Sequence, residues 1–251
     1  LPSAVARLRW ILPEQATIPA MRPIHSTLTE ASFAAVATPP RLEPGDVHLW
    51  LWRLPDVPAA RQLTRLARVQ LLALLKTYAG SELEPRLAYG THGKPHAATP
   101  GLPHFNVSHG GDCVAFAFCS EQELGVDVER GSPRRRHSAL ELATRFFAAE
   151  EAATLGGLDD AQRERSFLQL WTCKEAVLKA LGHGLSFGLN RLRFAIGSDG
   201  QVQALLSIAA EAGHPDEWQI HRFAAGSGHV GCLAWRGPAR TLRTFRLEAL
   251  P

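Results

Sequence analysis

Hydrophobic residues recur at helical spacing in three segments of the chain. The longest lies between the Asp159-Asp160 pair and Gly182, another covers 61–78 and ends before Gly80, and a third begins at Ser138. Asp is typical of a helix N-cap and Gly of a C-cap. The Ser138-x-x-Glu141 spacing is a capping box, so this pattern predicts a helix from residue 139, and Glu150 and Glu151 precede another short helix.

Shorter apolar runs with β-type composition separate and follow these helices. They cover 47–54, 105–109, 113–118, 124–129, 191–196, 202–208, 218–224 and 229–235, with 241–248 as a further candidate. The last of these runs are expected to form one antiparallel sheet with Ser-Asp-Gly at a hairpin. This order predicts an α+β fold.

The chain divides at a polar stretch, 119–123, into two parts. Residues 1–44 are rich in Pro, Ala and Thr and are expected to be an extended leader. Residues 45–120 would then form an N-terminal half and 121–251 a C-terminal half. The sequence shows no repeat strong enough to prove duplication. The chain begins with Leu, and its single methionine is Met21, so residues 1–20 are expected to be upstream sequence outside the fold.

Trp171, Glu175 and Lys179 follow one another at intervals of four on the longest predicted helix. Residues at this spacing share one edge of a helix, so an acid and a base lie side by side. Lys174 instead falls on the apolar arc, where an ammonium is costly without a partner. This departure from the pattern indicates a functional site, and the alternative is an ordinary surface ion pair on a core helix.

Two carboxylates occur in the predicted strand Leu124-Gly-Val-Asp-Val-Glu129. Asp127 and Glu129 point to the same side of this strand and repel each other unless a cation lies between them. Oxygen ligands of this kind favour Mg²⁺ or Mn²⁺ over zinc. The alternative is a solvent-facing edge strand with two solubilising acids.

Cationic residues that could bind an anion occur before this strand. Arg61, Arg65 and Arg68 lie near one another on the helix 61–78, where they form either a phosphate clamp or a solvated face. His109 follows a serine hydroxyl, Ser108, at the end of a predicted strand. It could meet an anion, although a lone histidine is more often structural.

Composition narrows the class of protein. The 251 residues are 45% hydrophobic and 20% charged, with a net charge of +3, as in a globular protein that takes an anionic ligand or an acidic partner. This excess is too small to argue for duplex nucleic acid. No apolar run approaches the ~20 residues of a membrane span. The cysteines form no C-x-x-C pair and are expected to be reduced thiols of a cytoplasmic protein.

Several motifs occur together in a fixed order. They are Gly93-Lys94-Pro95, Asn106-Val-Ser-His109, Gly125-Val-Asp-Val-Glu129, Phe146-Phe-x-x-x-Glu151 and Trp171-x-x-Lys-Glu-x-x-x-Lys179. With these motifs the chain resembles the two-domain, Sfp-type 4′-phosphopantetheinyl transferases over about residues 47–237. The resemblance implies Mg²⁺-dependent transfer of phosphopantetheine from coenzyme A to a serine of an acyl- or peptidyl-carrier protein, releasing adenosine 3′,5′-bisphosphate. It also implies a monomer built as a pseudo-dimer of two α/β halves, with the coenzyme in the cleft between them.

The resemblance also implies roles for individual residues. Asp127, Glu129 and Glu175 would hold the metal, and Lys179 would offset charge on the phosphates. Coenzyme contacts would come from Lys94, Ser108, His109 and Lys174, the last with a structural role as an alternative. Either Glu175 or Glu151 would be the general base for the carrier serine.

The N-terminal side departs from the family pattern, because the interval between 47–54 and 61–78 is too short for the usual basic segment. Arg61, Arg65 or Arg68 would have to supply the contact with the coenzyme 3′-phosphate. Two other functions use the same residues: a different Mg²⁺-dependent phosphoester enzyme, and a relative that binds coenzyme A or a carrier without catalysis.

Overall fold

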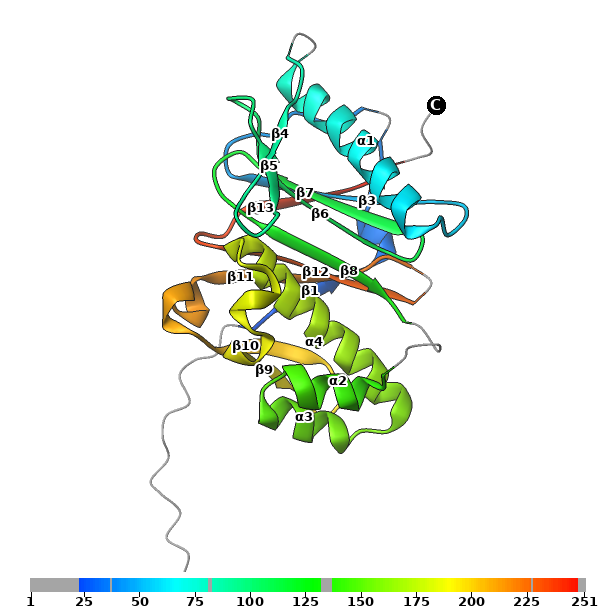
Figure 1. The fold of residues 1–251 in the computed structure, drawn as a ribbon, viewed down its shortest axis with the longest axis vertical. Helices are drawn as coiled ribbons and strands as arrows, with labels where there is room; N and C mark the ends of the chain where they lie inside the picture. Colours follow the sequence, from blue (N-terminus) through cyan, green and yellow to red (C-terminus); the bar gives the residue numbers. More distant parts are fainter. Residues whose placement is uncertain (1–22, 37, 81–82, 132–136, 227, 248–251) are drawn as a thin grey trace, which may run out of the picture.

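The computed structural model describes residues 23–36, 38–80, 83–131, 137–226 and 228–247. The described chain is layered in the order helix α1, five-stranded sheet, four-stranded sheet and helix α4 (Figure 1). The helices are α1 Ala60–Ala79, α2 Ala139–Phe146, α3 Ala149–Gly156 and α4 Asp160–Leu181. The strands are β1 His25–Leu28, β2 Ala34–Ala35, β3 Asp46–Arg53, β4 Leu87–Tyr89, β5 Pro95–Ala97, β6 His104–Gly110, β7 Cys113–Cys119, β8 Gly125–Arg130, β9 Leu192–Ile196, β10 Val202–Ile208, β11 Trp218–Ala224, β12 His229–Arg236 and β13 Thr241–Leu247.

Each of the two larger sheets contains three neighbouring antiparallel strands. The five-stranded sheet has the order β2-β13-β3-β7-β6, and the four-stranded sheet has the order β1-β11-β12-β8. Strands β3, β7 and β6 are antiparallel neighbours, as are β11, β12 and β8. Strands β4 and β5 form a separate hairpin, as do β9 and β10. This mixed α and β structure agrees with the predicted class.

The core has three apolar clusters, one for each contact between layers. The cluster between the two sheets includes Leu49, Val126 and Leu233, which are fully buried. Helix α1 covers the outer face of the five-stranded sheet through residues such as Leu75. Helix α4 covers the other sheet through residues such as Val177. Because apolar side chains on both faces of each sheet are removed from water, the strands read as nearly continuous hydrophobic runs.

The helix ends follow the capping signals in the sequence. Asp159 Oδ1 accepts a hydrogen bond from Gln162 N at 2.8 Å at the start of α4, and Gly182 ends the helix at φ +74°. The side chains of Ser138 and Glu141 form the predicted capping box of α2. These interactions are local, which explains why the sequence predicts the helix boundaries well.

Strands near the two ends of the chain pair with strands that are distant in sequence. Strand β13 was predicted to join a sheet of the C-terminal half, but it lies parallel to β3 in the sheet of the N-terminal half. The expected single sheet from the last strand-like runs is also wrong, because β9 and β10 form a hairpin of their own. Within the predicted leader, β1 pairs with β11. Period-2 patterns identify strands and their faces but not their partners.

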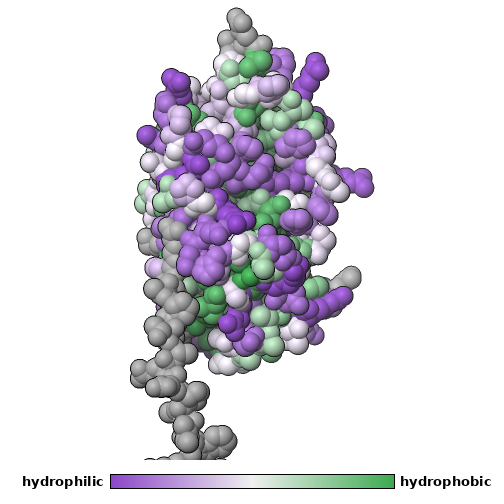
Figure 2. All heavy atoms as spheres, turned by 90° about the vertical axis from the view of Figure 1, so that its left-hand side faces the viewer, coloured by the Kyte–Doolittle hydropathy of each residue, from purple (hydrophilic) through white to green (hydrophobic). Residues whose placement is uncertain are grey.

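The four cysteines are free and buried, in line with the predicted thiols. On the face shown in Figure 2, hydrophilic residues predominate and hydrophobic ones form small separate groups. In the part of the chain that the structure describes, none of the helices has the length and apolar character needed to cross a membrane.

Candidate active site

Strands β6 and β8 belong to different sheets and are joined through side chains. Asn106 Oδ1 accepts a hydrogen bond from Val126 N at 2.8 Å, and Ser108 Oγ accepts one from Val128 N at 3.4 Å. Since alternate residues of a strand share a face, the Asn106-Val-Ser108 spacing is suited to bonding successive amides of β8. The motif therefore fixes β8 against β6 and brings Ser108 to Asp127.

Gly125 lets α4 approach β8 closely. A Cβ atom at this position would lie 2.0 Å from Ala176 O and 2.4 Å from Ala180 N, both on the helix backbone. Helix backbone cannot give way as a flexible side chain would, so only glycine fits. This close approach places Glu175 and Lys179 of α4 beside Asp127 of β8.

We expect Gly125→Ala to lower the free energy of unfolding by about 1–3 kcal/mol or more, because α4 must move away from β8. Urea denaturation would measure the loss. Gly90→Ala is a matched control, since a Cβ there would meet only Lys94 O, at an ordinary 3.7 Å. Equal stability of the two variants would show that the contact between β8 and α4 does not need glycine.

We call the place where Ser108 of β6, Asp127 of β8 and Glu175 and Lys179 of α4 come together the junction. The ammonium group of Lys179 lies at its centre. Its Nζ donates to Asp127 Oδ1 at 2.6 Å, Ser108 Oγ at 2.9 Å and Val126 O at 3.2 Å. Ser108 Oγ in turn donates to Asp127 Oδ1 at 2.8 Å. The alternative of a surface ion pair between Glu175 and Lys179 is therefore wrong, because Lys179 forms its ion pair with Asp127.

Two carboxylate oxygens at the junction have no hydrogen-bond partner among the described residues. They are Asp127 Oδ2 and Glu175 Oε1, and both atoms are buried. Burial, followed by the charge of Asp127, raises the pKa of Glu175 from 4.5 to about 7, while Lys179 opposes this shift. Buried oxygens without donors are costly, and carboxylate oxygens are ligands that a cation could use.

Two carboxylate oxygens are suitable in kind as ligands of a divalent cation. Among the described residues no three His, Cys, Asp or Glu side chains form a cluster that could hold a metal. Mg²⁺, however, commonly uses one or two carboxylates and completes its coordination with waters and substrate phosphates. Asp127 and Glu175 supply such a pair from a strand and a helix that are distant in sequence.

Glu129 lies at a different place from this pair. Its side chain lines a cavity of about 150 Å³ together with Leu142 of α2 and Phe167, Leu168 and Trp171 in the first half of α4. Among the described residues, Asp127, Glu129 and Glu175 do not form a cluster of three that could hold a metal, and the three-carboxylate site stays a prediction.

Glu151 and Lys174 form a buried ion pair in the core. Their Nζ–Oε2 distance is 2.8 Å, and the side chains are 1% and 0% exposed. Lys174 also donates to Leu189 O at 2.9 Å and to Leu192 O. Burial lowers the pKa of Lys174, and the charge of Glu151 opposes that shift.

The backbone completes the environment of Glu151. Its Oε1 accepts from Phe194 N at 2.7 Å and its Oε2 from Ala148 N at 3.0 Å. A carboxylate with its oxygens bonded and no exposure cannot reach a carrier serine, and a sealed ammonium cannot reach a phosphate. The structure thus corrects the expectation that Glu151 is a candidate base and Lys174 a coenzyme contact.

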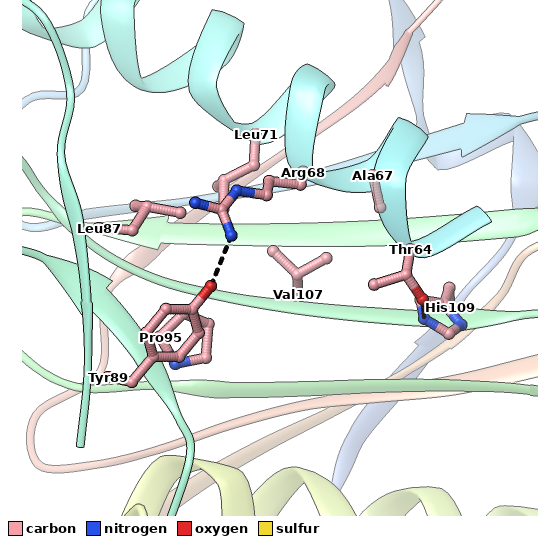
Figure 3. Close-up of a pocket in the computed structure, with 9 residues that line it drawn as sticks. All are labelled: Thr64, Ala67, Arg68, Leu71, Leu87, Tyr89, Pro95, Val107 and His109. Carbon is pink, nitrogen blue, oxygen red and sulfur yellow. Dashed lines mark hydrogen bonds between the residues drawn. The ribbon is translucent and has the colours of Figure 1, made fainter. Parts of the chain in front are cut away.

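A pocket of about 230 Å³ opens beside the junction, between α1 and strands β4, β5 and β6 (Figure 3). Its cationic and aromatic walls are Arg68 and Tyr89, joined by a hydrogen bond from Arg68 Nη1 to Tyr89 Oη at 2.8 Å. The remaining lining residues are Thr64, Ala67, Leu71, Leu87, Pro95, Val107 and His109. Arg61 and Arg65 are exposed on the same helix outside this pocket.

His109 links the pocket to the junction. Its Nε2 lies 3.5 Å from Thr64 Oγ1, and Figure 3 shows the ring at one end of the pocket, opposite Tyr89. Partial burial lowers the pKa of His109, and the cation of Lys179 acts in the same direction. Residues Thr64 and Tyr89 were missed from sequence, because β4 is too short to show a period and Thr64 has no distinctive neighbours.

Lys94 lies at the hairpin of β4 and β5 and faces the linker between the halves. Its Nζ bonds to the carboxylate of Glu123 and to Leu124 O at 3.1 Å. His104 Nδ1 lies 2.8 Å from the same carboxylate. Lys94 therefore connects the hairpin to the segment that leads into β8, while the next residue, Pro95, lines the pocket.

Comparison with known proteins identifies the family. Residues 123–233 match the model of the 4′-phosphopantetheinyl transferase superfamily. The chain is 39% identical to Sfp of Bacillus subtilis over 119 residues, 47% of this chain and 50% of Sfp. It is 32% identical to HetI of Nostoc over 180 residues, which are 59% of this chain and 74% of HetI.

A third relative is AcpT of Salmonella typhimurium, 36% identical over 133 residues, which are 52% of this chain and 67% of AcpT. All three relatives are named 4′-phosphopantetheinyl transferases. For the Sfp-like relatives of Bacillus, the chain spans about half of the length of the protein it matches. With the matched motifs running from β8 to β12 and the HetI match covering most of that relative, the chain belongs to the 4′-phosphopantetheinyl transferase superfamily.

Proposed function

We propose that the protein transfers the 4′-phosphopantetheine group of coenzyme A to a serine of an apo acyl- or peptidyl-carrier protein. The pair of unpartnered oxygens on Asp127 and Glu175, next to the ammonium of Lys179, carries this proposal. Attack on a pyrophosphate needs cations at the phosphate oxygens and a group that takes the proton of the nucleophile. The junction supplies the ammonium of Lys179, carboxylates that could hold a metal cation, and a carboxylate that could accept the proton.

The reaction exchanges a phosphoanhydride bond for a phosphoester bond, and the proton of the serine hydroxyl passes to a base. The serine oxygen forms a bond to the β-phosphorus, the bond from that phosphorus to the bridging oxygen breaks, and adenosine 3′,5′-bisphosphate leaves. Mg²⁺, with Mn²⁺ as an alternative, would be held by Asp127 and Glu175 and would neutralise the pyrophosphate oxygens. Glu129, two residues after Asp127 on β8, stays the predicted third ligand.

The chain's own side chains supply the remaining roles. Lys179, His109 and Ser108 would contact phosphate oxygens, because they adjoin the carboxylates on the side of the pocket. Glu175 remains as the candidate base for the serine proton, because its Oε1 lies at the junction without a hydrogen-bond partner among the described residues. Glu151 is enclosed in its pair with Lys174.

The nucleotide end of coenzyme A would occupy the pocket of Figure 3. Its apolar floor of Leu71, Val107 and Pro95 suits an adenine ring, and Arg68 offers a guanidinium for the 3′-phosphate. Of the predicted arginines, Arg68 lines the pocket. Lys94, one residue from the pocket, would lie at the rim near the nucleotide.

We expect Arg68→Ala to raise KM for coenzyme A about tenfold with little change in kcat, because the lost interaction is made equally before and during reaction. The preference for coenzyme A over 3′-dephospho-coenzyme A should shrink by the same factor. Arg65→Ala, an exposed neighbour on α1, is the control. Equal KM changes in both variants would mean that the phosphate lies elsewhere.

The two halves share an order of main elements, apart from α2 and α3, which occur only between β8 and α4, and this order supports the proposed pseudo-dimer. Each has a first strand, a long helix, a hairpin and two final strands, in the N-terminal half β3, α1, β4-β5 and β6-β7, and in the C-terminal half β8, α4, β9-β10 and β11-β12. In each half the first strand pairs antiparallel with the last. Such a monomer provides one cleft where β6 meets β8. We place it in the cytoplasm, where its free thiols would stay reduced.

The carrier protein is proposed as the acidic partner of a mildly basic enzyme. The net charge of +3 favours encounter with an acidic surface. The sequence also has a basic run, Arg134-Arg135-Arg136, which we include in this proposed encounter with the carrier and which lies outside the described residues.

A single assay tests the function. The protein is mixed with an apo carrier, coenzyme A and Mg²⁺, and the carrier is weighed by mass spectrometry. A gain of one phosphopantetheine group per carrier is expected. Coenzyme binding with no change in carrier mass would indicate a non-catalytic relative, and nucleotide turnover without a carrier would indicate a different phosphoester enzyme.

A further inference from the structure

The ammonium of Lys179 is bonded to one of the two carboxylates that would hold the divalent cation. We propose that the Lys179 ammonium partly neutralises the metal-binding carboxylates in the free protein and moves to the pyrophosphate when coenzyme A binds. Coenzyme binding would thereby complete the metal site. This inference rests on the proposed function for the identity of the phosphate ligand.

The ammonium of Lys179 finds all of its hydrogen-bond acceptors within the protein. Its three acceptors, Asp127 Oδ1, Ser108 Oγ and Val126 O, lie at 2.6–3.2 Å, which accounts for all three ammonium hydrogens. The bonds leave the other oxygen of Asp127 and Glu175 Oε1 unpartnered among the described residues. The ammonium therefore compensates only part of the site's negative charge.

The side chain also has room to move. Lys179 is 26% exposed, whereas Asp127 is 5% exposed. A lysine is a compact charge on a flexible four-carbon stem, so its head can change partners at little cost. His109, whose pKa the Lys179 charge lowers, marks the direction of the pocket that would receive the coenzyme.

Charge balance couples the binding of the metal to the binding of the coenzyme. Two carboxylates can neutralise a divalent cation, but the ammonium among them leaves excess positive charge, and repulsion between like charges weakens metal binding. A pyrophosphate brings negative charge for both cations and gives the ammonium new acceptors. Metal and coenzyme should therefore bind with positive cooperativity, part of which passes through Lys179.

The test measures Mn²⁺ binding to the free protein by electron paramagnetic resonance, with no coenzyme or carrier present. Lys179→Met should bind Mn²⁺ about tenfold more tightly than the wild type because the competing charge is gone. Lys179→Gln, which can still donate to Asp127, is a second uncharged variant. Lys179→Arg and Lys76→Met should match the wild type within about twofold, the latter because Lys76 lies on α1, paired with Glu84.

A second arm adds coenzyme A to each protein. The coenzyme should tighten Mn²⁺ binding by a larger factor in the wild type than in Lys179→Met. Unchanged or weaker Mn²⁺ binding in both uncharged variants, with thermal unfolding showing them folded, would overturn the inference. So would equal coenzyme factors in the wild type and Lys179→Met. Neither readout needs carrier modification, so failure of the proposed function would be seen separately in the carrier assay.

Discussion

Glu175→Gln is expected to lower kcat/KM for carrier modification by about three orders of magnitude, the loss of about 4 kcal/mol of transition-state stabilisation. Glutamine keeps the shape of the side chain but has no charge for a divalent cation and takes no proton from a serine. Asp127→Asn should cause a loss of similar size. The rate of carrier mass gain at saturating Mg²⁺ measures both.

The same variant should be more stable than the wild type at neutral pH. Burial and then the Asp127 charge raise the pKa of Glu175 from 4.5 to about 7, so the folded protein keeps a proton that the unfolded chain releases. The contribution of Glu175 to stability therefore falls as pH rises from about 4.5 to 7 and stays low above 7. Glu175→Gln removes this fall.

Urea denaturation in EDTA at several pH values tests the effect. Above pH 7 the Gln variant should exceed the wild type by on the order of 2 kcal/mol, a value reduced for partial exposure, and near pH 4.5 the two should agree. Glu150→Gln, at an exposed position on α3, should show neither effect. A Gln variant that is less stable at pH 8, or one that keeps full activity, would remove Glu175 from the cation site.

Glu151→Gln is expected to lower the free energy of unfolding by about 3–5 kcal/mol. The change leaves the ammonium of Lys174 buried, fully inaccessible and without its counter-ion. Its remaining partners are the carbonyl groups of Leu189 and Leu192 and the rings of Phe147 and Phe194, at 5.0 and 5.7 Å from Nζ. These cannot replace a charge. Chemical denaturation measures the loss.

The double variant Glu151→Gln with Lys174→Met separates structure from catalysis. Met has a similar length and packs well between aromatic rings, and the Gln carbonyl can still accept from Phe194 N. Most of the lost stability should return, and kcat should stay within about tenfold of the wild type, because neither side chain reaches the junction. A stable double variant that modifies no carrier would restore Glu151 as the general base.

Much of the local structure could be predicted from sequence, and the reason is local chemistry. Asp159 and Gly182 mark the ends of α4 through bonds to its own backbone, and the apolar period identifies its buried face. The strands β3, β6, β7 and β8 are likewise evident as apolar runs between turn residues. Strands β4 and β5 have three residues each, too few to show a period, and were missed.

The site was predicted in part, and the misses share a cause. Lys174 was recognised as an anomaly on an apolar arc, but the anomaly is resolved by Glu151, which lies on another helix. Glu175 and Lys179 were expected side by side on one edge of α4, but their spacing could not show that α4 packs closely on Gly125, so that Lys179 reaches Asp127. Periodicity gives the direction of a side chain but not what stands opposite it.

The sequence by itself determined the helices and their caps, most of the strands, and the motifs that indicate the family. Each of these depends on residues within a few positions of one another. The tertiary structure decided that β13 returns to pair with β3, that Arg68 and Tyr89 share a pocket, and that Asp127 meets Glu175 and Lys179. These pairings form only when the layers pack together. The free energy of that packing comes from contacts between side chains that are distant in the sequence, so no local pattern reveals it.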